Sequence, residues 1–165
     1  MKFLLRFVLF FFIITFSACE RKSCTDVICP GINSTCINGQ CYCQAGYEGD
    51  NCDILSYKKY VGSYQVSESC TTTFSGYVNQ SYSASISPGF QIDVITIGNF
   101  ANRGLPVDVT IIDATYLAIV EQNIGAVNVS GGQGTYQVFN NRIEFDYNYT
   151  VSGNFHSCTG IFTKF

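Results

Sequence analysis

Cysteine is the residue that most restricts how this chain can fold. The 165 residues include nine cysteines, and six of them lie within residues 24–52. A stretch this short cannot bury enough apolar surface to offset its chain entropy, so it needs covalent cross-links to hold one structure. Structural disulfides persist in oxidising compartments, so the cysteine content predicts an exported protein. The odd total leaves one cysteine that needs another chemical fate.

The first residues have the pattern of a secretory signal. Two cations, an almost wholly apolar run over residues 7–16 and two small residues precede Cys19. This order predicts cleavage after Ala18, so residues 1–18 are expected to be a signal peptide. The alternative is a short transmembrane anchor, which needs about 20 apolar residues, and the run is well short of that.

The residues at the cleavage site, Phe16-Ser17-Ala18-Cys19, resemble the lipobox of bacterial lipoproteins, with Phe16 in place of the usual aliphatic residue. In that family a diacylglycerol is joined to the cysteine thiol, and the new N-terminal amine is also acylated. The resemblance implies that Cys19 is the lipid attachment site and that residues 19–23 form a short tether. Several acyl chains give stable membrane anchoring, where one chain alone binds marginally. The alternative is a secreted protein whose Cys19 is free or joined to another molecule.

Residues 24–53 have the cysteine spacing of a known module. The spacing is Cys24-x4-Cys29-x6-Cys36-x4-Cys41-x-Cys43-x8-Cys52, and Gly46-Tyr47-Glu48-Gly49 lies between the last two cysteines. Spacing alone leaves the pairing open. The pattern resembles an EGF-like domain, and that resemblance implies disulfides from Cys24 to Cys36, from Cys29 to Cys41 and from Cys43 to Cys52. Asn38-Gly39 predicts a tight hairpin inside the module, because both positions accept positive φ.

Metal binding is not expected in this module. The spacing lacks the paired C-x2-C set of a zinc site, and exported proteins rarely keep their thiols reduced. Some EGF-like modules bind calcium through acidic and amide residues before the first cysteine. Here that stretch is Glu20-Arg21-Lys22-Ser23, which has two cations and no such pattern. We therefore expect no metal ion and no cofactor.

After Asp53 the composition becomes that of a β domain, which we place at residues 57–165. Apolar and polar residues often alternate, most clearly over residues 142–151, and this period predicts strands with one buried face. About eight strands are expected after merging of one or two among 62–68, 72–86, 90–97, 107–113, 116–121, 125–130, 134–139, 142–151 and 154–163. The predicted fold is all-β: an antiparallel meander closing into a small barrel, which leaves no exposed edge. A β-sandwich is the alternative.

Turn residues separate the expected strands. They predict turns at Pro88-Gly89, Gly98-Asn99, residues 102–104, residues 130–134 and Asn140-Asn141. Glycine, proline and asparagine favour such positions because they accept or impose the turn conformations.

Cys70 and Cys158 remain as a pair, one near each end of the β domain. A disulfide between them would close a loop of about 90 residues, worth roughly 4–5 kcal/mol on the entropic model. It would also place the first and last strands side by side, as barrel closure requires. The domain resembles the lipocalin-like small barrels of Bacteroidota lipoproteins. The matching features are the Tyr60-Val-Gly-Ser-Tyr64 opening, the early Cys70, the Ile97-Gly-Asn-Phe100 turn, and Cys158 close to Lys164.

Catalytic motifs are absent from the sequence, which has no G-x-S-x-G, H-E-x-x-H, phosphate-loop or dinucleotide pattern. The single histidine, His156, is expected to be structural. Glu144 with Asp146, and Asp108 with Asp113, are carboxylate pairs of the kind used in glycoside hydrolysis. Polar residues that alternate along a strand are normally its solvated face, so we expect a non-enzymatic protein with no catalytic residue.

Charge and export together suggest a function. Removal of residues 1–18 takes the formal net charge from −3 to −5, and an acidic surface disfavours nucleic acid and anionic lipid headgroups. We expect an envelope protein at the outer membrane, anchored by the lipid on Cys19. Its EGF-like module would present the barrel to a surface protein or a glycan. The alternatives are a carrier of a small apolar ligand inside a tyrosine-lined barrel, and a glycan-acting hydrolase.

Overall fold

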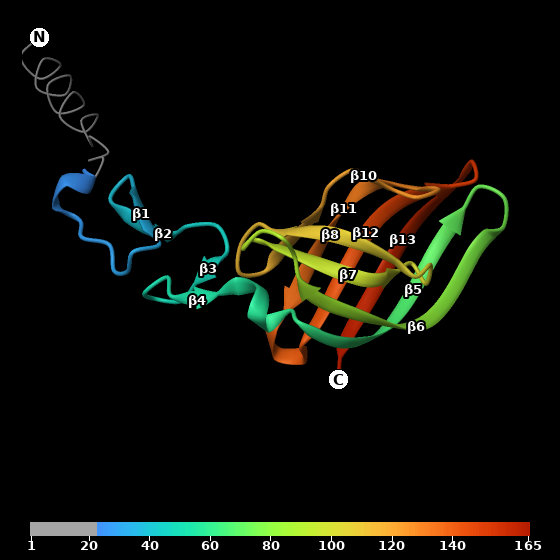
Figure 1. Cartoon of the computed structure of the whole chain (residues 1–165), viewed down its shortest axis with the longest axis horizontal. Helices are drawn as coiled ribbons and strands as arrows, with labels where there is room; N and C mark the ends of the chain where they lie inside the picture. Colours follow the sequence, from blue (N-terminus) through green and yellow to red (C-terminus); the bar gives the residue numbers. More distant parts are fainter. Residues whose placement is uncertain (1–22) are drawn as a thin grey trace, which may run out of the picture.

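The computed structural model describes residues 23–165, which form a small disulfide-rich part and a β-barrel (Figure 1). The expected signal peptide, Cys19 and the tether up to residue 22 lie outside the described residues. Within residues 23–165 there is no α-helix, so the predicted all-β class is confirmed. In the same residues no helix is long and apolar enough to cross a membrane.

The N-terminal part consists of two short antiparallel ladders that disulfides hold together. One pairs β1 (Ser34–Ile37) with β2 (Gln40–Cys43), and the other pairs β3 (Tyr47–Glu48) with β4 (Ile54–Leu55). Asn38-Gly39 joins β1 to β2 with positive φ at both residues. The disulfides join Cys24 to Cys36, Cys29 to Cys41 and Cys43 to Cys52, the pairs that the EGF-like spacing implied.

The rest of the chain forms a closed antiparallel barrel of eight strands. Its segments are β5 (Gly62–Thr72), β6 (Gly76–Pro88), β7 (Val94–Phe100), β8 (Leu105–Ile111), β9 (Tyr116–Ile119), β10 (Gln122–Ile124), β11 (Val127–Gln137), β12 (Arg142–Val151) and β13 (Asn154–Lys164). Neighbours pair in turn from β5 to β9 and from β10 to β13, and the pairs β13–β5 and β11–β9 complete the ring. β9 and β10 lie along β11 in one continuous register, so they are two halves of one interrupted strand. The barrel is confirmed over the β-sandwich.

A disulfide and one glutamine side chain support the closed ring. Cys158 of β13 lies directly opposite Cys70 of β5, with Cα atoms 4.1 Å apart and a disulfide between them. This is the expected bond between the first and last strands. Where β9 is interrupted, the side chain of Gln122 substitutes for strand backbone: its Nε2 donates to the carbonyl of Asp108 at 2.8 Å, and its Oε1 accepts from the N–H of Asp108 at 3.0 Å.

Two of the expected turns, at residues 130–134 and at Gly98-Asn99, lie inside strands and are wrong. Residues 130–134 lie inside β11, which carries a bulge after Val129, so the strands expected at 125–130 and 134–139 are parts of one strand. The glycines there make room for the rings of β12. A Cβ on Gly134 would overlap the Phe145 ring, and a Cβ on Gly132 would lie 2.6 Å from the Cβ of Tyr147. Glycine inside a strand marks such close approaches or bulges as well as turns.

At the other strand ends, some of the expected turns are confirmed and one is not. Gly98-Asn99 lies inside β7, which continues to Phe100, and the turn follows at residues 101–104. The expected turns at Pro88-Gly89 and Asn140-Asn141 are confirmed, the second with the short helix η3 (Val138–Asn140) before it. The positive φ of Asn99 therefore marks an irregularity of the strand rather than its end.

The barrel interior is filled by its own side chains. The buried aromatic residues that face inward are Tyr64, Tyr82, Phe100, Tyr136, Phe145, Tyr147, Tyr149 and Phe162. Their rings contact one another: the Phe145 and Phe162 centroids are 5.3 Å apart, and those of Phe100 and Tyr147 are 4.6 Å apart. Rings of this size bury large apolar areas and gain further from edge-on contacts. The tyrosine-rich interior is a packed core.

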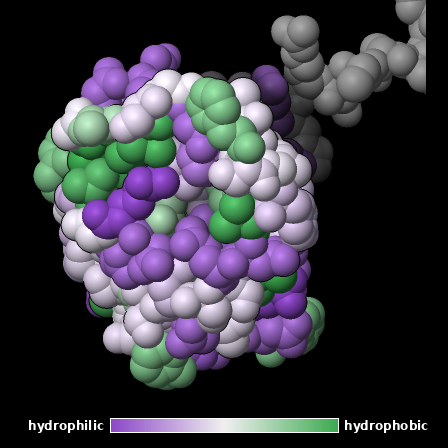
Figure 2. Space-filling model, turned by 90° about the vertical axis from the view of Figure 1, so that its right-hand side faces the viewer, coloured by the Kyte–Doolittle hydropathy of each residue, from purple (hydrophilic) through white to green (hydrophobic). Residues whose placement is uncertain are grey.

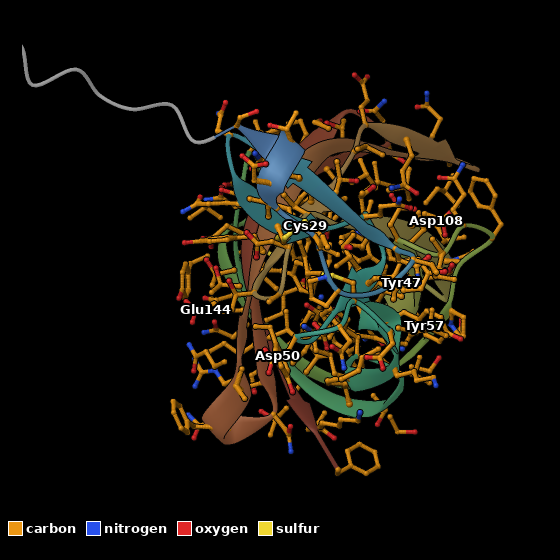
Figure 3. The ribbon with its side chains drawn as sticks, turned by 90° about the vertical axis from the view of Figure 1, so that its left-hand side faces the viewer. Cys29, Tyr47, Asp50, Tyr57, Asp108 and Glu144 are labelled. Atoms are coloured by element: carbon orange, nitrogen blue, oxygen red, sulfur yellow. A yellow bond between two sulfur atoms is a disulfide. The ribbon has the colours of Figure 1, made fainter. Side chains whose placement is uncertain are left out.

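The N-terminal part lies against one end of the barrel, next to the short helix η2 (Ser56–Lys59) (Figures 1 and 3). Gly46 approaches the β6–β7 loop so closely that a Cβ would lie 2.7 Å from a methyl carbon of Ile92. Lys59 pairs with Glu48 and donates to the carbonyl of Ala114 at 2.7 Å. The opposite end of the barrel carries the β5–β6 and β12–β13 turns. Figure 2 shows that end, where hydrophilic and hydrophobic residues are intermixed.

Candidate functional site

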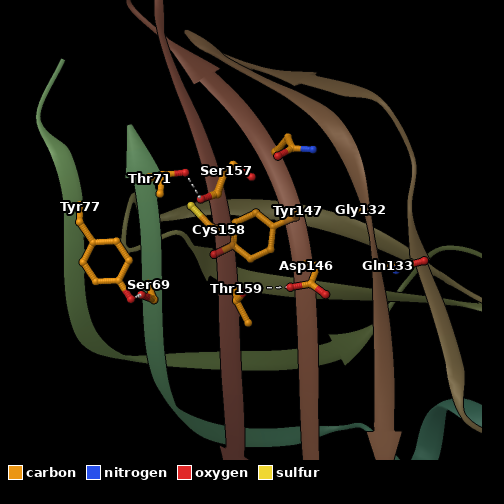
Figure 4. A pocket seen from close by; sticks show the side chains of 11 residues that line it. Ser69, Thr71, Tyr77, Gly132, Gln133, Asp146, Tyr147, Ser157, Cys158 and Thr159 are labelled. Atoms are coloured by element: carbon orange, nitrogen blue, oxygen red, sulfur yellow. Dashed lines mark hydrogen bonds between the residues drawn. The ribbon is translucent and has the colours of Figure 1, made fainter. Parts of the chain in front are cut away.

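An open groove of about 750 Å³ crosses the outer face of the barrel (Figure 4). It runs over β6, β5, β13, β12 and β11. Successive strand residues point to opposite faces, so outward-facing neighbours of buried core residues form most of it, and Gly132 adds exposed backbone. We call the following residues the outer groove: Ser69, Thr71, Tyr77, Gly132, Gln133, Asp146, Asn148, Ser157 and Thr159.

Short hydroxyl side chains form the floor of the outer groove. Across the β5–β13 pair, Ser69 lies directly opposite Thr159, and Thr71 lies directly opposite Ser157. The inter-strand disulfide joins the residues between these two pairs, on the inner face of the same strands. A covalent bond therefore lies directly beneath the floor and fixes the spacing of the two strands that form it.

Longer side chains on the flanking strands form the walls. On β6, Tyr77 is 66% exposed, and its hydroxyl is hydrogen-bonded to Ser69. On β12, Asp146 accepts a hydrogen bond from the hydroxyl of Thr159 at 2.6 Å through Oδ1. Among the described residues no side chain bonds to the other oxygen of Asp146 or to the amide of Asn148. These groups are free to contact a ligand.

The outer groove is polar but carries little charge. Within the described part of the chain, the residues that line it include one carboxylate, Asp146, and no lysine or arginine. It offers hydroxyl, amide and carboxylate groups together with one exposed aromatic ring. Such a surface can exchange hydrogen bonds with a neutral polar ligand, and it has no cation to pair with a phosphate or sulfate.

A buried carboxylate lies inside the barrel on the same strands. Glu68 is 2% exposed, and it accepts hydrogen bonds from the hydroxyl of Tyr82 at 2.7 Å, from Nε2 of Gln80 at 2.6 Å and from the hydroxyl of Tyr147. Its Oε1 lies 3.1 Å from the sulfur of Cys70. Neither ion pair of the described residues includes Glu68, so neutral donors hold it.

The tyrosines around Glu68 stay protonated. Burial raises the pKa of Tyr82 and Tyr147 well above the ordinary value of 10.0, and the charge of Glu68 contributes to both shifts. Both hydroxyls therefore remain donors to the carboxylate. The nearby sulfurs of Cys70 and Cys158 are bonded to each other and provide no thiolate for a metal ion. The Glu68 cluster is a satisfied polar network inside the core.

The carboxylates considered for hydrolysis are held in separate environments. Glu144 and Asp146 share the outer face of β12, as expected, but Glu144 pairs with the arginine two residues before it at 3.3 Å. Asp108 accepts a hydrogen bond from a threonine of β7 at 2.6 Å. Asp113 accepts backbone N–H groups of the turn before β9, which hold the pKa of its carboxyl below the usual range. Of the four, Asp146 lies in the outer groove.

His156 is part of an aromatic stack at the end of the barrel remote from the N-terminal part. Its ring lies parallel to that of Tyr149, with centroids 4.4 Å apart and an interplanar angle of 7°. Burial lowers the pKa of His156, and the positive charge of Arg103 lowers it further. Its Nε2 is buried without a hydrogen-bond partner among the described residues. These features fit the expected structural role.

Sequence reasoning did not single out Glu68 or Tyr77. Glu68 did carry a signal, because it occupies an inward position of β5, two residues after Val66 and two before Cys70. A charged residue at a core position is rare and usually hydrogen-bonded. Tyr77 carried no such signal, since its place beside Thr71 depends on the register of the β5–β6 pair.

Comparison with known proteins identifies the fold and no activity. No family model matches the chain, and no curated protein is similar to it in sequence. The chain is similar to a crystal structure from Bacteroides ovatus described as being of unknown function, with a TM-score of 0.50 and 10% identity. The match covers 64% of this chain and 41% of that one, so the chain spans about two fifths of its length.

These findings define the class of protein. The chain is a small antiparallel β-barrel preceded by a disulfide-rich part, and it resembles in fold a structure from Bacteroides. Four disulfides in the described residues indicate an extracytoplasmic protein, because thiols are kept reduced in the cytosol.

Proposed function

We propose that this chain is a non-enzymatic binding protein of the cell envelope, anchored in the outer membrane by lipid on Cys19. In this proposal an EGF-like module, residues 24–53, holds the barrel near the membrane and presents its outer surface to a partner. The filled barrel interior is the observation that carries the proposal. Because its own aromatic side chains occupy the inward positions, the barrel can offer a partner its outer face.

The arrangement of the N-terminal part supports the anchoring and presentation. Four residues, Glu20 to Ser23, separate Cys19 from the first cysteine of the module, and fully extended they reach on the order of 15 Å. Three disulfides cross-link the module, and the contacts of Gly46 with Ile92 and of Lys59 with Glu48 fix it to the barrel. A tether this short would keep the module at the membrane surface and direct the far end of the barrel outward.

Two alternatives have less support. A carrier of an apolar ligand needs an open interior, but the rings of Phe145, Phe162 and Tyr147 fill the middle of the barrel. A glycan-acting hydrolase needs two carboxylates that act together, and Glu144 already pairs with an arginine. Native mass spectrometry that finds a bound lipid would favour the carrier.

The test of the anchoring is mass analysis of the mature protein. We expect a chain that begins at Cys19, with the added mass of a diacylglycerol and one further acyl chain, recovered with membranes. A Cys19→Ser variant should lose the lipid and leave the membrane fraction. A mature N-terminus without lipid, or wild-type protein recovered in the soluble fraction, would refute the anchoring.

The test of binding uses the full protein immobilised in detergent with its disulfides intact. Envelope polysaccharides and envelope proteins are passed over it separately, and the reduced, unfolded protein is the matched control. We expect the folded form alone to retain one of the two fractions. Retention of neither fraction would refute a binding function while leaving the anchoring result unaffected.

A further inference from the structure

We propose that the outer groove binds a neutral carbohydrate, which names the partner class of the proposed function and rests on it. The groove volume of about 750 Å³ is within the range of roughly 300–1,000 Å³ usual for small-molecule sites. Its position on the outer face leaves it open to a segment of a longer polysaccharide as well as to a short oligosaccharide.

The polar side chains of the groove match the hydroxyl groups of a sugar. A sugar hydroxyl both donates and accepts, so a good site offers acceptors and donors close together. Asp146 is an acceptor with a free oxygen, and Asn148, two residues later on the same strand face, can donate and accept. Ser157 and Thr159 add hydroxyls on the neighbouring strand, opposite Asn148 and Asp146 in the register.

Tyr77 provides the apolar contact that a sugar also needs. One face of a pyranose ring presents C–H groups, and these pack on the electron-rich face of an aromatic ring. Tyr77 is 66% exposed, yet the bond to Ser69 restrains its ring at the side of the groove. An exposed ring held in one place loses little entropy when a ligand stacks on it.

The charge of the groove disfavours anionic ligands, and the pairing of its strands disfavours an extended peptide. The described residues that line it provide no lysine or arginine to compensate a phosphate, sulfate or uronate, and Asp146 would repel such groups. An extended peptide usually binds by adding a strand to an open sheet edge, whereas β5, β13, β12 and β11 beneath this groove are paired on both sides. The open side of β6 near Tyr77 is the one away from β5 and the groove floor. A neutral polyhydroxyl ligand fits both observations.

The floor of the site is rigid before any ligand arrives. The Cys70–Cys158 disulfide joins the two strands that carry the floor residues, and the pairing of these strands with β6 and β12 restrains the strands on either side. A preformed site avoids part of the ordering cost of binding. The disulfide therefore contributes to binding as well as to stability.

The proposal is tested by titration calorimetry on the full chain with its disulfides intact. The probes are the neutral hexasaccharides of cellulose, chitin, starch and mannan, and a heparin hexasaccharide serves as the anionic comparison. We expect at least one neutral probe to bind and the heparin probe not to bind. Tyr77→Ala should weaken binding about fivefold to tenfold. Tyr77→Phe keeps the ring but loses the bond to Ser69, so it should weaken binding less than Tyr77→Ala does.

The matched control is Tyr42→Ala, which removes a 49% exposed tyrosine of the N-terminal part and should leave binding unchanged. Asp146→Asn and Asn148→Ala test the opposite wall and should each weaken binding. Amide chemical shifts of the wild-type protein locate the probe without any substitution, and we expect changes at Ser157 and Thr159.

Three results would overturn the proposal. These are no binding of any neutral probe, binding of heparin in preference to the neutral probes, and binding equally weakened by Tyr42→Ala and Tyr77→Ala. Shift changes confined to residues outside the groove would also overturn it. Each of these results leaves the lipid on Cys19 and the membrane fractionation untouched, so failure of this proposal is distinguishable from failure of the anchoring.

Discussion

Replacement of Glu68 by leucine should destabilise the barrel by about 2–6 kcal/mol. The leucine has a similar size, so the loss comes from the hydroxyls of Tyr82 and Tyr147, which are buried and would lose their acceptor. Leaving one such group unsatisfied costs about 1–3 kcal/mol. The amide of Gln80, 2.6 Å from the carboxylate, would lose its partner too.

Two further variants separate this account from a simple packing defect. Glu68→Gln keeps an acceptor oxygen, and the Gln80 amide can turn to accept from the new NH2, so this variant should cost less than about 1.5 kcal/mol. The triple variant Glu68→Leu with Tyr82→Phe and Tyr147→Phe removes the hydroxyls themselves. It should recover most of the loss, because removal of both partners of a hydrogen bond can be nearly neutral.

The assay is urea unfolding with the disulfides intact, followed by far-ultraviolet circular dichroism. The midpoint and the slope are compared across the variants, since a constant slope shows that the extent of unfolding is unchanged. A loss below about 1 kcal/mol for Glu68→Leu, or a triple variant less stable than that single variant, would refute the reasoning.

The same assay checks three other features. Replacing Cys70 and Cys158 together by serine should cost about 4–5 kcal/mol, from the 88-residue separation they span; a loss under about 1 kcal/mol would contradict that origin. Gly134→Ala should cost about 1–3 kcal/mol because the new Cβ overlaps the Phe145 ring, and the cost should shrink in a Phe145→Leu background. Because burial lowers the pKa of His156 below 6.5, the unfolded chain binds the proton first as pH falls. The contribution of His156 to the free energy of unfolding is thus complete above about pH 6.5 and declines below that pH. The loss of stability on acidification should be smaller in His156→Phe, and a variant with the same pH dependence as wild type would contradict this account.

Much of the fold could be predicted from local sequence features. Alternation over residues 142–151 predicts β12 because the side-chain period of a strand is two. The remote pair Cys70 and Cys158 suggested the β5–β13 contact, since a disulfide requires its cysteines to be neighbours. Both inferences depend on constraints that a single segment or pair of residues imposes.

The errors and omissions have a common physical cause. Gly132 and Gly134 look like turn residues in isolation, and the reason for them is the rings of Phe145 and Tyr147 on the next strand. The outer groove likewise depends on the register of five strands, which brings Tyr77 and Asp146 to opposite sides of one floor. Pairing across strands is set by tertiary structure, and a list of residues in order does not contain it.

Closure of the ring has a consequence for molecules that share one membrane. Copies confined to a surface collide often, and an unpaired strand edge would let them zip together into fibres. Here each barrel strand is paired on both sides over at least part of its length, and Gln122 supplies hydrogen bonds where β9 ends. The residues of β6 before Ser85 pair with β5 alone, so they remain an open edge. Crowded neighbours would therefore meet a short edge on β6 in place of the two full edges of an open sheet, which limits how far they could join.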